Sequence, residues 1–102
     1  MTTELGRLKL AAQVGLLGHV TANLRSVCVN VEGNKITVRF YFDNKLSDVD
    51  EECAEAVMDE IIADLHTDSA GIENIFDYKT VQISYPTKTP LQGFWVYRRF
   101  ES

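Results

Sequence analysis

The sequence predicts an α+β domain of element order αββαββ, with a four-stranded antiparallel sheet and two helices packed on one face. Apolar residues recur at three- and four-residue steps in residues 3–17 and 47–65, which is the pattern of an amphipathic helix. Apolar and polar residues alternate in four other stretches, which is the pattern of strands with one covered face. The chain has 102 residues, so we expect one domain spanning residues 1–102.

The first helix is expected from Thr3 to about Leu17. Its apolar stripe consists of Leu5, Leu8, Ala12 and Leu16, widened by Ala11 and Val14. Gly15 and Gly18 stand where the helix should end, because glycine readily adopts the left-handed conformation that terminates helices.

A hairpin is expected next, with arms at 24–31 and 36–42. Residues 32–35, Glu-Gly-Asn-Lys, are a turn signal between two alternating runs. One face of the hairpin carries Val27, Val29, Val31, Ile36, Val38, Phe40 and Phe42. The other carries Ser26, Cys28, Asn30, Thr37, Arg39 and Tyr41, and we expect it to be the wetter face.

The second helix is expected from a cap at Ser47 to about Leu65. Ser47 and Asp50 have the spacing of a capping box. The inner stripe is Val49, Cys53, Val57, Ile61 and Leu65, with Ala54, Met58 and Ile62 beside it. Strands at 75–85 and 94–100 then form a second hairpin, and two hairpins joined by a helix most economically build one antiparallel sheet.

Motifs for catalysis or metal binding are absent from the sequence. It contains no glycine-rich phosphate loop and no CxxC, HxxxH or HExxH pattern. Cys53 falls on an apolar stripe, where cysteine behaves as a small buried hydrophobe, whereas the environment of Cys28 stays open. We therefore expect no enzyme activity, no metal and no cofactor.

The net charge of the chain indicates what kind of partner it can bind. The net charge is −5, so the domain should repel nucleic acid and anionic membranes and favour a basic protein. No apolar stretch approaches the length of a membrane helix, and two cysteines are too few for a disulfide scaffold. These features predict a cytoplasmic protein.

A cluster of acidic residues on the second helix is the strongest anomaly. Between residues 43 and 64 the sequence has nine acids and one base, Lys45. The predicted ridge comprises Asp48, Glu51, Glu52, Glu55 and Asp59, opposite the apolar stripe. The helix dipole explains acids in the first turn, but Glu55 and Asp59 lie beyond it. The ridge is either a solvated face that maintains solubility or a surface for a basic partner.

The last predicted strand is rich in aromatic residues and arginine. Alternation places Trp95, Tyr97 and Arg99 on one face, a composition typical of interface anchors. The alternative is a purely structural role, in which Arg98 or Arg99 forms an ion pair with an acidic residue of the same domain.

Three segments carry a resemblance to a known class of proteins. They are residues 17–27 (LGHVTANLRSV), 41–43 (YFD) and 95–101 (WVYRRFE). With the αββαββ order, the chain resembles small bacterial immunity proteins of the contact-dependent growth-inhibition or colicin type. The resemblance implies a cytoplasmic inhibitor that binds a cognate toxin, often a nuclease, and blocks its active site.

The sequence thus predicts an immunity protein, monomeric or homodimeric, whose toxin has a basic active-site cleft. The predicted toxin-binding residues are Asp48, Glu51, Glu52, Glu55, Asp59, Trp95, Tyr97 and Arg99. One alternative is a non-enzymatic adaptor or structural subunit that homodimerises through its sheet. Another is an RNA-binding module using Tyr41, Trp95, Tyr97 and Arg99, which the net charge disfavours.

Overall fold

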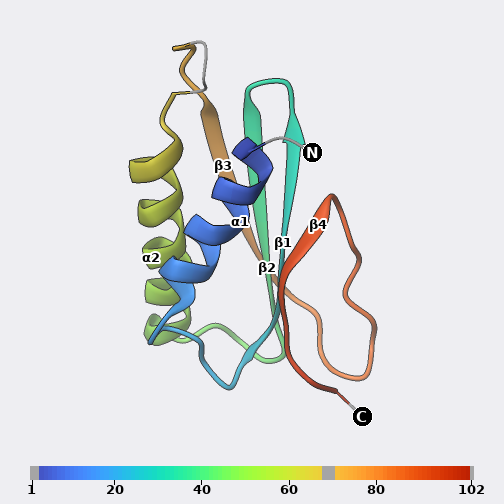
Figure 1. The fold of residues 1–102 in the computed structure, drawn as a ribbon. Helices are drawn as coiled ribbons and strands as arrows, with labels where there is room; N and C mark the ends of the chain where they lie inside the picture. Colours follow the sequence, from blue (N-terminus) through green and yellow to red (C-terminus); the bar gives the residue numbers. More distant parts are fainter. Residues whose placement is uncertain (1–2, 68–70, 102) are drawn as a thin grey trace.

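Two helices cover one face of a four-stranded sheet in the computed structural model, which describes residues 3–67 and 71–101 (Figure 1). The α+β class and the predicted order along the chain are confirmed. The elements are α1 (Thr3–Leu16), β1 (Leu24–Glu32), β2 (Lys35–Phe42), α2 (Asp48–Leu65), β3 (Ile75–Gln82) and β4 (Phe94–Arg98).

The sheet is mixed, so the predicted antiparallel sheet is wrong. Its strand order is β3-β2-β1-β4. β1 pairs antiparallel with β2 and β4, but β3 runs parallel to β2, from the Lys35–Ile75 pair to the Phe42–Gln82 pair. The first hairpin is therefore confirmed, whereas β3 and β4 lie at opposite edges and form no hairpin.

The connections explain this topology. α2 is 18 residues long and returns the chain to the end of the sheet where β2 began, which is how parallel neighbours are usually joined. Residues 83–93 separate β3 from β4, a connection much longer than those of ordinary hairpins.

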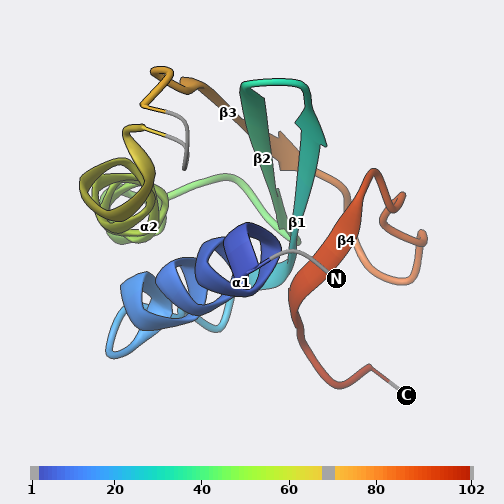
Figure 2. The ribbon, with the colours of Figure 1, turned by 45° about the horizontal axis from the view of Figure 1, so that its top comes forward.

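The helices lie side by side, with α1 nearer β4 and α2 nearer β3 (Figure 2). They approach closely at Gly15 of α1. A Cβ there would lie 2.7 Å from the Cα of Val57, which is too close for any side chain. Gly15 is thus a helix-packing residue inside α1, one residue before the helix ends.

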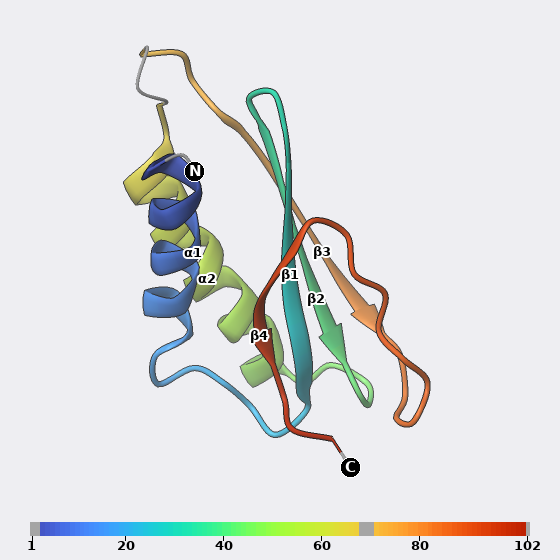
Figure 3. The ribbon, with the colours of Figure 1, turned by 45° about the vertical axis from the view of Figure 1, so that its right-hand side comes forward.

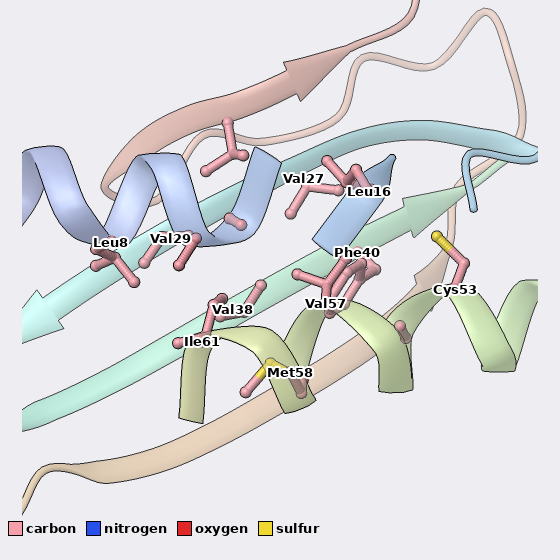
Figure 4. Close-up of a cluster of buried hydrophobic side chains, with 14 of the residues drawn as sticks. Leu8, Leu16, Val27, Val29, Val38, Phe40, Cys53, Val57, Met58 and Ile61 are labelled. Atoms are coloured by element: carbon pink, nitrogen blue, oxygen red, sulfur yellow. The ribbon is translucent and has the colours of Figure 1, made fainter. Parts of the chain in front are cut away.

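The core lies between the helices and the sheet (Figure 4). Val57, Ile61 and Leu65 are buried there with Val29, Val38 and Phe40, as predicted. Val49 and Ile62 were wrongly placed inside, since they are 59% and 41% exposed. The buried arc of α2 includes Asp50 instead of Val49. On α1, Val14 is 41% exposed, and the Leu5 side chain is outside the described part.

The second face of the sheet is not uniformly wet, which corrects the expectation. Ser26, Cys28, Thr37 and Tyr41 on this face are buried. The connection between β3 and β4 lies on this side, opposite the helices (Figure 3), and Ser26 Oγ donates a hydrogen bond to Thr89 Oγ1 there, with the two oxygens 3.0 Å apart. Cys28 is therefore a buried thiol like Cys53.

Candidate functional site

The start of α2 is fixed by a buried carboxylate. Ser47 and Asp50 form the predicted capping box. Asp50, 2% exposed, also accepts hydrogen bonds from Thr21 Oγ1 at 2.6 Å and Asn23 Nδ2 at 2.9 Å. Burial alone would raise the pKa of Asp50, but these donors and the Ser47 N–H outweigh burial and lower the pKa. Asp50 therefore holds the α1–β1 connection against α2 and sets the orientation of that helix.

The five acids predicted to form a ridge all lie on α2 with exposed side chains. They are Asp48, Glu51, Glu52, Glu55 and Asp59, called the acidic ridge below. Within residues 3–67 and 71–101, none of the five forms an ion pair, because the ion pairs found there engage Asp43, Asp64 and Glu101. The ridge thus presents uncompensated negative charge to solvent.

A groove separates α2 from β3 beside this ridge. Its wider part, about 450 Å³, is lined by Glu55, Met58, Asp59, Ile62, Phe76 and Tyr78. A smaller adjoining hollow, about 130 Å³, is lined by Glu51, Ala54, Glu55, Tyr78 and Thr80. Three ridge carboxylates therefore flank a groove with apolar and aromatic lining, which we call the α2–β3 groove.

The aromatic strand β4 differs from its predicted alternation. Trp95 pairs with Cys28 and Tyr97 pairs with Val27, and the register shift between these pairs is a β-bulge. Since Val27 and Cys28 point to opposite faces of β1, Trp95 and Tyr97 do not share a face. Tyr97 packs against the core, while the guanidinium of Arg98 stacks on Trp95 at 4.9 Å from the ring centroid.

Arg99, the third residue predicted on that face, is held by the fold. Its guanidinium donates to Ala22 O at 2.8 Å, Asp43 Oδ2 at 3.2 Å and Glu101 Oε2 at 3.0 Å. Of the two arginines considered for an internal pair, Arg99 makes it. Trp95, Tyr97 and Arg99 therefore do not form one surface with the acidic ridge. The strand β4 lies at one edge of the sheet, whereas α2 packs near β3 at the other edge.

Arg25 forms the centre of a second internal network. It is 3% exposed and donates from Nε and Nη2 to the two oxygens of Glu101, at 2.7 and 2.8 Å. Its Nη1 donates to the carbonyls of Ile83 and Thr87, at 2.7 and 2.6 Å. This bonding outweighs a smaller effect of burial and lowers the pKa of Glu101 from 4.5 to about 2.

No metal centre is found in the part of the chain that the structure describes. No three His, Cys, Asp or Glu side chains there converge to hold a metal ion. Burial raises the pKa of the Cys53 thiol to about 11, and the nearby Asp50 charge adds to the shift, so this sulfur is a poor nucleophile. None of the described helices is long and apolar enough to span a membrane.

Comparison with known proteins identifies the family. The family model described as MafI2 immunity protein matches residues 6–101, nearly the whole chain. The chain belongs to the MafI2 immunity protein family. The predicted resemblance to small toxin-immunity proteins is thereby confirmed, although the matched family is MafI2 and not a contact-dependent growth-inhibition or colicin group. No curated protein matches the chain.

The segments that carried the resemblance converge on the internal networks of this MafI2-family chain. Residues 17–27 supply Thr21, Asn23 and Arg25, and residues 95–101 supply Arg99 and Glu101. Sequence reasoning missed these contacts, although a charged Arg25 inside an apolar strand was a signal that it needs a buried partner. It also missed the groove residues Phe76 and Tyr78, for which the local sequence offered no signal, and it placed the groove residue Ile62 inside the core.

Proposed function

We propose that this protein neutralises a cognate toxin in the cytoplasm by binding it through the acidic ridge. The toxin would be a nuclease, whose active-site cleft must be basic to hold phosphates. The observation that carries the proposal is the set of five exposed ridge carboxylates without ion-pair partners in the described residues, on a chain of an immunity family.

Simple occlusion is sufficient for this function. A partner that covers the cleft with carboxylates competes with the phosphates of the substrate, and complementary charge speeds association. Such a protein needs no catalytic residue, cofactor, nucleic-acid site or membrane contact of its own. The internal networks hold α2 in place so that the ridge is presented without rearrangement.

Charge reversal on the ridge tests the proposal. The double variant Glu55→Lys/Asp59→Lys should remain folded, because both side chains are exposed and lysine forms helices well. The cognate toxin would first be identified by a pull-down against the products of adjacent genes, and the affinity of the double variant for it should fall at least tenfold. The control Glu32→Lys/Glu73→Lys makes the same charge change at exposed positions outside α2 and β3 and should bind nearly as the wild type.

Two results would contradict the proposal. Equal affinity of the ridge and control variants would reduce the ridge to a solubility device. Absence of any toxin complex with the wild-type protein, together with self-association, would favour the adaptor alternative.

A further inference from the structure

The open edge of β3 runs beside the α2–β3 groove. β3 is an outer strand and, within the described residues, pairs only with β2. It has eight residues, contains no proline, and exposes Ile75 at 56% and Tyr78 at 42%. Edge strands of this length are usually covered or interrupted, because their free backbone groups pair readily with another chain.

The direction of these backbone groups follows from the pairing. The Ile75 N–H donates to Asn34 O and the Ile83 N–H to Phe42 O, both at 2.8 Å. In a parallel ladder, residues alternate between the two sides, and the N–H and C=O of one residue point the same way. The N–H and C=O groups of Phe76, Tyr78 and Thr80 therefore point away from β2, toward the open edge.

The same three residues turn their side chains toward α2. Phe76, Tyr78 and Thr80 pair with Ile36, Val38 and Phe40, whose side chains lie in the core on the helix side. The Tyr78 ring meets the Phe40 ring edge-on, with centroids 6.1 Å apart. The groove lining thus joins an unpaired backbone edge to the carboxylates of Glu51, Glu55 and Asp59.

We propose that the α2–β3 groove and the open edge of β3 together receive an extended, basic segment of the toxin, which adds to the sheet as a fifth strand. Side chains on a strand alternate between faces, so every second residue of that segment would face α2. Lysine or arginine at those positions would lay its aliphatic stem along Tyr78 and Ile62 and place its charge at the ridge.

This inference rests on the proposed function but adds the backbone edge to it. The acidic ridge alone would bind a basic surface of any shape. The groove and the edge require an extended segment, and they predict that backbone changes in β3 affect binding as much as charge changes on α2.

Proline substitution tests the edge. Thr80→Pro removes an N–H that points away from β2 and so keeps the β2–β3 hydrogen bonds, as proline is tolerated at such edge positions. Thr80→Ala is the matched control, because it removes the same side chain and keeps the N–H. With a catalytically inactive form of the cognate toxin, Thr80→Pro should weaken binding at least tenfold, and Thr80→Ala less than threefold.

A second variant tests the groove without altering the backbone. Ile62→Lys places a positive charge in the groove at a position already 41% exposed, and should also weaken binding at least tenfold. In the wild-type complex, hydrogen exchange at the Tyr78 and Thr80 amides should slow. Exchange at the Lys79 amide should change little, because its N–H already faces β2.

The outcomes separate the two proposals. If the wild-type protein binds the toxin but Thr80→Pro and Ile62→Lys bind equally well, the strand-addition inference is overturned and the immunity function stands. If the wild-type protein does not bind, both fail.

Discussion

Arg25 is an unusual residue to bury in a domain this small. Its guanidinium joins β1 to the Glu101 carboxylate and to two carbonyls of the β3–β4 connection. Arginine suits this role because its fixed fork can satisfy several acceptors at once. Arg99 adds a second link, from Glu101 to Asp43 at the end of β2. These residues link β1, the β3–β4 connection and the end of β2 to Glu101.

The Glu101 carboxylate should make stability depend on acid pH. Its pKa falls from 4.5 to about 2 on folding, so its contribution is present above about pH 4.5 and lost as pH falls toward 2. Glu101→Gln should lower the free energy of unfolding at neutral pH by about 2 kcal/mol, less than for a fully buried pair because Glu101 is partly exposed. Urea unfolding at pH 7, 4 and 3 should show a smaller acid loss for the variant. Parallel curves for both proteins would refute this role.

At the scale of single elements, α2 carries different kinds of residue on its two faces. Its buried side contributes Val57 and Ile61 to the core, whereas its exposed side carries the acidic ridge. Like charges four residues apart cost about 0.2–0.5 kcal/mol per pair, so the ridge destabilises the isolated helix. The capping box and the Asp50 hydrogen bonds offset this cost.

Neighbouring isoleucines on α2 provide a test of this arrangement. Ile61→Asp should unfold the domain, because it places an unpaired carboxylate at a fully buried position, a penalty comparable to a total stability of about 5–15 kcal/mol. Ile62→Asp should remain folded, since Ile62 is 41% exposed. Circular dichroism melts of both variants distinguish the positions. A cooperative melt for Ile61→Asp would show that the helix faces are assigned incorrectly.

For the whole molecule, local patterns predicted the elements and the pairing of β1 with β2, but not the pairing of β3 and β4. The helix and strand positions and the β1–β2 hairpin followed from periodicity and turn residues. The parallel placement of β3 depends on the end of the sheet to which α2 returns the chain. No short sequence pattern predicts this. The bulge in β4 likewise moved Trp95 and Tyr97 to different faces without any local sign.

The candidate site likewise has one part that local sequence patterns predicted and one part that depends on strand pairing. Periodicity correctly placed the acidic ridge on the exposed side of α2. The groove beside it forms only because β3 is next to β2, and so Phe76 and Tyr78 could not be connected with the ridge from the sequence. The groove is thus a consequence of the strand order, which no single segment of the sequence reveals.

An engineered disulfide tests that topology. Thr37 and Asp77 are direct partners in the β2–β3 pair, and neighbouring strands lie about 4.8 Å apart, within the range that a disulfide spans. Thr37→Cys/Asp77→Cys should form an intramolecular disulfide in the folded monomer, visible as a mobility shift on non-reducing gels. Asp77→Cys/Arg98→Cys should not, because β3 and β4 lie at opposite edges. Crosslinking of the second pair instead would support the antiparallel hairpin.

The most direct test of the immunity function is the salt dependence of toxin binding. The affinity and association rate of the wild-type protein and its cognate toxin would be measured by surface plasmon resonance from 50 to 500 mM NaCl, a range that we choose to vary the screening of exposed charges. A complex that uses the acidic ridge should form, associate more slowly as salt rises, and abolish toxin activity at equimolar ratio. Binding that is independent of salt, or no binding at any salt concentration, would contradict the account.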